Sequence, residues 1–160
     1  MLNRNYLTAI VGGYSLVYLL LVLAWLDAWP VSLMVAAGCC LLITLVAVGA
    51  FSYQMWQLIP ADQARMTPLQ AILRNFIPVY NAYWLYQVLW GFTKDANAYI
   101  QRRQLKTPLL PDRLAFYYVT LSLLSVLPYL WFITIPTAIV LITIIVSRII
   151  QFSVTVHRND

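Results

Sequence analysis

The amino-acid sequence predicts an all-α integral membrane protein with four transmembrane helices, arranged as two hairpins in a single domain over residues 1–160. Of these residues 62% are hydrophobic and 9% are charged, and the mean hydropathy is +0.78, far from the averages of soluble domains. The apolar residues form uncharged runs of about 20, the length that crosses a bilayer as a helix. A more polar segment, residues 56–103, separates two pairs of these runs.

Residues 6–26 and 31–53 are the first two predicted transmembrane helices, and neither contains a charged residue. Tyr6 and Trp25 stand at the two ends of the first, where aromatic rings prefer the headgroup level of the membrane. Pro30 suits the first turn of the second helix, because its missing N–H is not needed there. Small residues allow helices to approach closely in lipid, and the second helix contains six that predict such contacts: Ala36, Ala37, Gly38, Ala47, Gly49 and Ala50.

The central segment is expected to begin its first helix at a capping box. Thr67 is the predicted N-cap, Pro68 the first helical residue and Gln70 the reciprocal partner of the cap. This helix should end near residues 75–77, because Pro78 disfavours helical geometry in the residue before it and lacks a backbone donor.

A second central helix should begin after Asn81, whose side-chain oxygen can cap it, and should continue to about Arg103. The uncharged residues 75–93 are long enough to cross a membrane, but a crossing there would place the basic residues that follow in an outer loop. That arrangement opposes the positive-inside bias, whereas four crossings keep all ten basic residues on or near one side. We therefore expect residues 67–103 to contain a broken helix that lies in the cytoplasmic interface or re-enters the membrane, with both termini cytoplasmic.

Residues 114–131 and 137–156 are the third and fourth predicted transmembrane helices. Asp112 can cap the third, and Pro128 and Pro136 bracket the expected return between the two.

Arg148 is the one charged residue within the fourth predicted transmembrane helix. Ionisable groups inside membranes are candidates for function. This one lies roughly two turns from the cytoplasmic end, where a long side chain can reach the headgroups.

The composition excludes several kinds of chemistry. The chain has a single histidine, His157, which cannot supply paired haem ligands, and glutamate is absent. Cys39 and Cys40 are adjacent within an apolar run, so neither a disulfide framework nor a zinc-ligand spacing is available. No carboxylate lies inside a predicted span to relay protons. We therefore expect no metal, no cofactor and no enzymatic activity. The net charge of +5 indicates membrane orientation and anionic headgroups rather than nucleic acid.

The candidate functional residues are polar and aromatic side chains of the central segment, together with the arginine of the fourth span. The aromatic residues suit an interfacial belt that anchors an amphipathic helix. The alternative is a pocket or docking surface for a lipid, a pigment, a quinone or a partner helix. The candidates are Trp56, Asn75, Pro78, Tyr80, Asn81, Tyr83, Trp84, Tyr86, Trp90, Asp95, Asn97 and Arg148.

The central segment also contains an ordered set of motifs. These are W-x2-I at Trp56, R-x2-P at Arg65, I-P-x2-N-x-Y-W over residues 77–84, then Gly91 and D-x-N at Asp95. In this combination the segment resembles a widespread, uncharacterised family of small bacterial multi-pass inner-membrane proteins. Val79 and Tyr80 stand where an aromatic pair is common in that family, and Leu69, Gln70 and Ile72 replace a glycine-rich step. The resemblance implies a bacterial inner-membrane location and no particular activity.

These observations predict a non-enzymatic protein that acts by association, as an accessory or scaffold subunit of a larger bacterial inner-membrane complex. Its expected partners are other membrane proteins and membrane lipids, including anionic headgroups. The alternative is a binding or transport protein for a lipid, quinone, pigment or other hydrophobic small molecule through the central aromatic segment. A lipid-modifying enzyme is the weakest hypothesis, because no paired acid and base is present.

Overall fold

The computed structural model describes residues 2–26, 30–73, 80–127 and 129–159. Every regular element within these residues is helical. Three of the described helices, α1, α2 and α7, are long and apolar enough to cross a membrane. The elements are α1 (Arg4–Leu26), α2 (Val31–Trp56), α3 (Pro68–Leu73), α4 (Tyr80–Leu85), the π-helical η2 (Tyr86–Gly91), α5 (Phe92–Arg103), α6 (Asp112–Leu124) and α7 (Trp131–Asn159).

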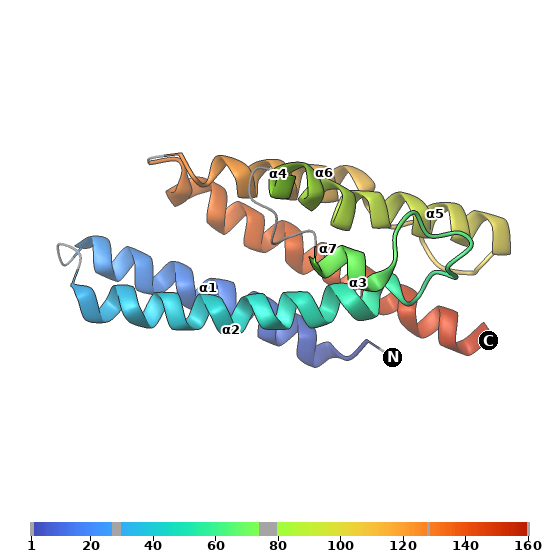
Figure 1. The fold of residues 1–160 in the computed structure, drawn as a ribbon, viewed down its shortest axis with the longest axis horizontal. Helices are drawn as coiled ribbons and strands as arrows, with labels where there is room; N and C mark the ends of the chain where they lie inside the picture. Colours follow the sequence, from blue (N-terminus) through green and yellow to red (C-terminus); the bar gives the residue numbers. More distant parts are fainter. Residues whose placement is uncertain (1, 27–29, 74–79, 128, 160) are drawn as a thin grey trace.

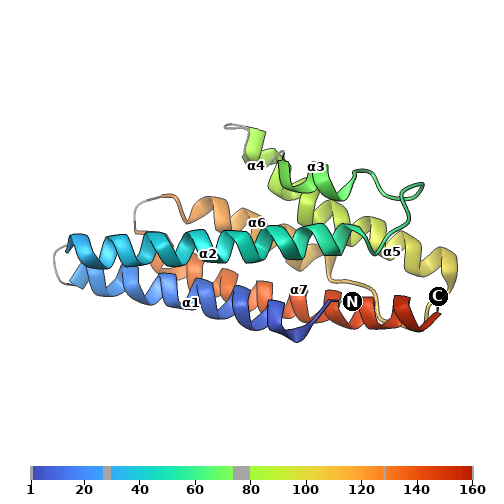
Figure 2. The same cartoon turned by 60° about the horizontal axis from the view of Figure 1, so that its bottom comes forward.

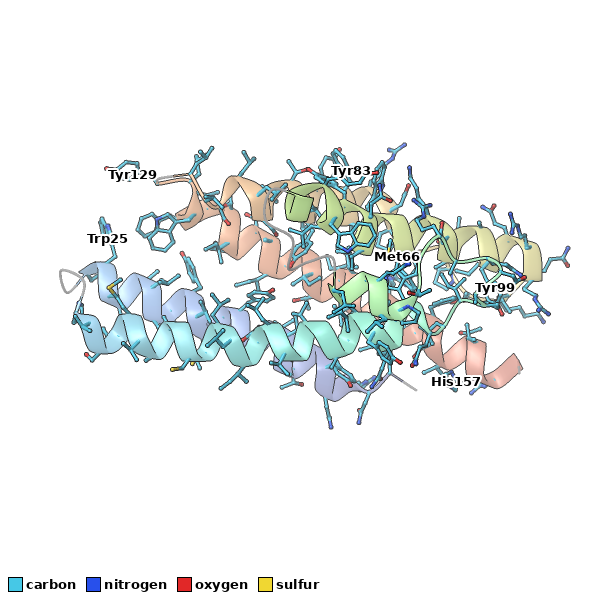
Figure 3. The ribbon with its side chains drawn as sticks, in the orientation of Figure 1. Trp25, Met66, Tyr83, Tyr99, Tyr129 and His157 are labelled. Carbon is cyan, nitrogen blue, oxygen red and sulfur yellow. The ribbon has the colours of Figure 1, made fainter. Side chains whose placement is uncertain are left out.

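The long helices lie side by side along one axis of the molecule (Figure 1). α1 packs on α2 and on α7, and α7 packs on α6. Both ends of the chain lie at one end of the bundle in two views (Figures 1 and 2). We call this the terminal end, marked by Tyr99 and His157, and the opposite one the hairpin end, marked by Trp25 and Tyr129 (Figure 3).

The first helical hairpin agrees with the sequence. α1 and α2 cover the predicted residues 6–26 and 31–53, with small extensions at Arg4 and Trp56. The two helices approach closely where Gly13 meets Thr44, because a Cβ at Gly13 would overlap the threonine Oγ1.

The third predicted transmembrane helix is shorter than expected. α6 ends at Leu124, so the prediction of one helix over residues 114–131 is wrong in extent. Its 13 residues span about 20 Å, less than the hydrocarbon thickness of about 30 Å. Pro111 occupies the N-cap position and Asp112 is the first residue of α6, so Asp112 is not the predicted cap. Its charge still suits the positive end of the helix dipole.

α7 begins at Trp131, six residues before the predicted start at 137, and Pro136 lies inside it. The prediction that this proline ends the return between the helices is therefore wrong, and Pro128 lies outside the described residues. A proline at 136 cannot donate to the carbonyl of Phe132, four residues earlier. The hydroxyl of Tyr18 donates to that carbonyl instead, at 3.2 Å, so α1 supplies the hydrogen bond that the helix loses.

The central segment forms a short helix and then a long helical run. The capping box is confirmed: Thr67 N–H donates to Gln70 Oε1, and Gln70 N–H donates to Thr67 Oγ1, both at 3.2 Å. The helical run α4–η2–α5 extends to Arg103 as predicted, but it begins at Tyr80, so Asn81 lies within its first turn and not at the N-cap. The run lies along α6 and points towards the terminal end (Figure 1).

The buried core is concentrated at the terminal end. Here the last turns of α2 and α7 enclose side chains of η2 and α5, and the largest fully buried side chains are Trp56, Phe92 and Phe152. Towards the hairpin end, by contrast, α1 and α2 expose many large apolar side chains, such as Leu19, Leu42 and Val46. Exposed apolar surface of this extent on long helices is expected of a protein surrounded by lipid.

Candidate functional site

Two of the candidate tryptophans are buried and fasten the central segment to its neighbours. Trp56 donates its indole N–H to the carbonyl of Val88 at 3.2 Å and packs edge-on against Phe92. Trp84 donates to the carbonyl of Ala71 at 3.4 Å, which joins α3 to α4. A buried indole needs such an acceptor. Both side chains therefore act as structural anchors in this arrangement.

Four residues spaced four apart form what we call the polar stripe of the central helical run: Tyr83, Gln87, Gly91 and Asp95. Along it, Gln87 donates its amide to the hydroxyl of Tyr83 at 2.9 Å. The guanidinium of Arg65 lies across the stripe, donating to both carboxylate oxygens of Asp95 through Nε, at 3.0 and 2.9 Å, and to Gln87 Oε1 through Nη1, at 3.4 Å. The backbone N–H of Arg65 also donates to Asp95, at 3.2 Å.

The π turn η2 explains why the polar stripe stays straight. In an α-helix, residues four apart drift steadily around the axis, because one turn holds 3.6 residues. A π turn closes hydrogen bonds across five residues and is wider. Residues four apart in it are therefore displaced around the axis in the opposite direction, which cancels the drift. The contact with Arg65 also needs space at position 91, because a Cβ at Gly91 would lie 3.3 Å from Arg65 Nη1. Glycine therefore lets the guanidinium lie against the helix.

The ion pair sets the electrostatics of this site. The side chain of Arg65 is 39% exposed and that of Asp95 is 12% exposed. Hydrogen bonding to Asp95 raises the pKa of Arg65 above its ordinary value, and partial burial opposes that effect. Because the pKa of Arg65 is raised, its guanidinium stays positively charged at all lower pH values and loses that charge only in strong alkali. The pair holds the loop over residues 57–67 against the central helical run.

A second group of candidates lies between η2 and α6. The hydroxyl of Tyr86 shares a hydrogen bond of 3.0 Å with Thr120 Oγ1. The rings of Tyr86 and Trp90 each lie 5.4 Å from that of Phe116. Lys94 places its Nζ 3.6 Å above the Trp90 ring, within the range of a cation–π interaction.

Asn97 clamps the loop that leads into α6. Its Nδ2 donates to the carbonyl of Leu110 at 2.9 Å, and its Oδ1 accepts the N–H of the same residue at 2.7 Å. This pairing imitates backbone pairing and uses both halves of the amide. Asn97 is thus engaged in positioning Leu110, a buried residue.

The remaining candidates are not part of this arrangement. Arg148 is exposed on α7 and donates to Gln151 Oε1 at 3.4 Å. Asn75 and Pro78 lie outside the described residues, and for Tyr80 and Asn81 the structure describes the backbone alone.

Sequence reasoning missed the partners that complete the site. Arg65 was identified only within a motif, and Gln87, Lys94, Thr120 and Leu110 were not candidates at all. The four-residue spacing of the polar stripe was a local signal that could have revealed Gln87. Leu110 contributes only backbone atoms, so its side chain carried no signal of this role.

A cavity of about 590 Å³ opens beside the ion pair, between the end of α2, the loop over residues 57–67 and the start of α3. Its walls are mainly apolar and include Trp56, Ile59 and Met66. The polar residues that line it are Gln57, Arg65, Thr67 and Gln70. A wall of this kind suits a largely apolar molecule with one or two hydrogen-bonding groups.

The arrangement is suited to holding and positioning rather than to acid–base chemistry. The one carboxylate of the polar stripe is engaged by Arg65, and the described residues that line the cavity include no ionisable side chain besides Arg65. Within the described ranges, no three side chains of the types His, Cys, Asp and Glu gather as a metal site. Comparison of the chain with protein-family models, with curated proteins and with solved structures found no match in any of the three.

Proposed function

We propose that the protein acts by association, as a non-enzymatic accessory or scaffold subunit of a larger complex in a bacterial inner membrane. One observation carries this proposal: the central side chains that could have formed a reactive site are engaged in contacts within the protein. Trp56, Trp84 and Asn97 bind backbone carbonyls, and Asp95 binds Arg65. The surface that stays available is the apolar exterior of the long helices.

The exterior of α2 supports association within the membrane. Val35, Leu42 and Leu45 are exposed there, at spacings that place them on one helical face. Gly38 and Gly49 lie on the same face, and a Cβ added to either would meet nothing within 4 Å. Small residues at such positions let a second helix approach closely in lipid.

We further propose four membrane crossings with both termini in the cytoplasm. α1, α2 and α7 provide three of them. The fourth is the passage from Asp112 to Tyr129, in which α6 and the residues after it run from the level of η2 towards the hairpin end (Figures 1 and 3). The terminal end then holds the exposed basic residues Arg102, Arg103 and Arg158, in agreement with the positive-inside bias. The short helix α3, which packs on α2, and α4 then form a re-entrant element.

The test is purification from the native membrane in mild detergent, followed by mass spectrometry of what travels with the chain. We expect a stoichiometric protein partner. The double variant Gly38→Ile with Gly49→Ile should lose that partner, because the added side chains block close helix approach. Gly12→Ile is the matched control, since a Cβ at Gly12 also meets nothing within 4 Å, but on α1. Recovery of the wild-type chain only as a free 18 kDa monomer contradicts the proposal.

The cavity beside Arg65 favours one other function, the binding of a hydrophobic small molecule such as a lipid, quinone or pigment. Ala61 is exposed and lines this cavity, so Ala61→Trp should fill it without disturbing the core. Under this second function the variant loses a small molecule that copurifies with the wild type. Ala50→Trp, at an exposed position of α2 outside the cavity wall, should keep it. Equal ligand content in all three proteins removes this alternative.

A further inference from the structure

The pair of antiparallel helices formed by the central run and α6 has a well-defined register. Tyr86 meets Thr120 and Trp90 meets Phe116 within α6, and Asn97 meets Leu110 in the loop just before α6. From one contact to the next, residue numbers rise along the central helical run and fall along its partner, as antiparallel packing requires. Lys94 lies between the second and third of these contacts, and in this register it stands opposite Asp112 and Arg113.

Two cations therefore flank one point of the surface. Lys94 is one turn beyond Trp90, and Arg113 is one turn before Phe116, so both lie on the same side of the Trp90–Phe116 ring contact, towards the terminal end. Both are exposed. The Lys94 ammonium is already held over the Trp90 ring at 3.6 Å.

Among the residues that the structure describes, neither Lys94 nor Arg113 forms an ion pair. The ion pair that the described residues form joins Arg65 to Asp95, which removes the carboxylate adjacent to Lys94. Asp112 makes no ion pair with either cation within the described ranges. It sits in the first turn of α6, where the helix dipole stabilises its negative charge, and it is one acid beside two cations. The surface thus keeps an excess of positive charge.

The depth of this surface follows from the exterior of α7 and from the rings. On one face of α7 the exposed side chains are Ile133, Thr137, Val140 and Ile144, followed by Arg148, Gln151 and Val154. Arg148 is the first charged residue on this face, so we take the hydrocarbon to end near it. On α6, Phe116 and Tyr117 are exposed. Tyrosine and tryptophan rings prefer the headgroup level. Cations placed one turn beyond such rings meet the phosphates of the inner leaflet.

We propose that Lys94 and Arg113 bind the headgroup phosphate of an anionic phospholipid, with its acyl chain against the rings of Trp90 and Phe116. Two cations on adjacent helices fit one phosphate better than a single snorkelling side chain does, and the aromatic floor excludes water from one side. The inference goes beyond association as a function, because it assigns a lipid site to a surface that the association proposal does not use.

The test is reconstitution of the full chain into phosphatidylcholine vesicles that contain a minor fraction of spin-labelled phosphatidylglycerol, with the immobilised fraction as the readout. We expect the wild type to immobilise phosphatidylglycerol in preference to spin-labelled phosphatidylcholine, and salt to weaken that preference. The double variant Lys94→Gln with Arg113→Gln should lower the affinity on the order of tenfold. Arg4→Gln with Arg158→Gln removes the same charge elsewhere at the terminal end and should keep the preference.

Three outcomes overturn the proposal. The first is equal immobilisation of the two lipids by the wild type, which needs no variant and so does not depend on the folding of one. The second is an equal loss in the two double variants, which shows a diffuse effect of net charge. The third is displacement of the labelled lipid by inorganic phosphate, which shows a site for a soluble anion instead of a lipid.

Discussion

At the scale of single residues, two positions on α1 govern how this helix meets its neighbours. Gly13 provides the close approach to Thr44 of α2, and Tyr18 satisfies the Phe132 carbonyl that Pro136 leaves unbonded in α7. In lipid, helix association depends on such packing and hydrogen bonds, since burial of apolar surface gives little between helices there. A substitution at each position gives a prediction that can be compared with a control variant.

Gly13→Ala is expected to destabilise the protein by about 1–3 kcal/mol, because the new methyl group overlaps Thr44 and forces α1 away from α2. The control is Gly12→Ala, whose methyl group meets open space and which should be neutral or slightly stabilising in a helix. Thermal unfolding in detergent, followed by circular dichroism, measures both. Equal effects of the two variants would show that the Gly13 contact does not limit helix packing.

Tyr18→Phe is expected to destabilise the protein by about 1 kcal/mol, because the Phe132 carbonyl then has no donor. The same substitution should have a smaller effect in a Pro136→Ala background, where the backbone N–H of residue 136 can donate to that carbonyl. Unfolding free energies of the two single variants and the double variant form a cycle that measures this coupling. A coupling energy near zero contradicts the assignment of Tyr18 as the replacement donor.

At the scale of elements, the central helical run is fastened to two loops. Arg65 binds the polar stripe across η2 and α5, and the run in turn clamps the loop before α6 through Asn97. The π turn places the stripe under Arg65. The wider π turn thus sets which side chains of the run face Arg65. It lies near the two loops of the terminal end that contact the run.

Asp95→Asn should loosen the loop over residues 57–67, because the neutral amide binds the guanidinium more weakly than the carboxylate does. Backbone amides of this loop, including the N–H of Arg65 that donates to Asp95, should exchange with deuterium about tenfold faster. Asp62→Asn is the control, since Asp62 is an exposed acid of the same loop that forms no ion pair among the described residues. Unchanged exchange in Asp95→Asn, or equal changes in both variants, contradicts the clamp.

At the scale of the whole molecule, the structure separates a lipid-facing part from a packed terminal end. α1 and α2 are apolar and exposed for most of their length, whereas the last turns of α2 and α7 pack around buried side chains of η2 and α5. This division agrees with a chain that crosses the membrane repeatedly and builds its compact core near one membrane surface.

Four crossings can be tested by labelling cysteines from each side of the membrane in a background that lacks Cys39 and Cys40. Leu26→Cys and Tyr129→Cys, at exposed positions of the hairpin end, should react with an impermeant thiol reagent in intact cells. Lys106→Cys and Arg158→Cys should react only in inverted membrane vesicles. Labelling of Leu26→Cys and Tyr129→Cys from opposite sides would show that α6 and the residues after it do not complete a crossing.

The sequence by itself determined the helical class, the extent of α1 and α2, and the capping box of Thr67 and Gln70. Uncharged length and a cap are local properties that act within a few turns of the chain. Only the tertiary structure decided that Pro136 lies inside α7. The carbonyl of Phe132, to which Pro136 cannot donate, accepts a hydrogen bond from Tyr18, 114 residues away. The tertiary structure also decided that Arg65 pairs with Asp95, 30 residues away, because that contact depends on the π turn and on the approach of a loop. Local patterns predict elements, whereas these contacts depend on which elements come to lie side by side.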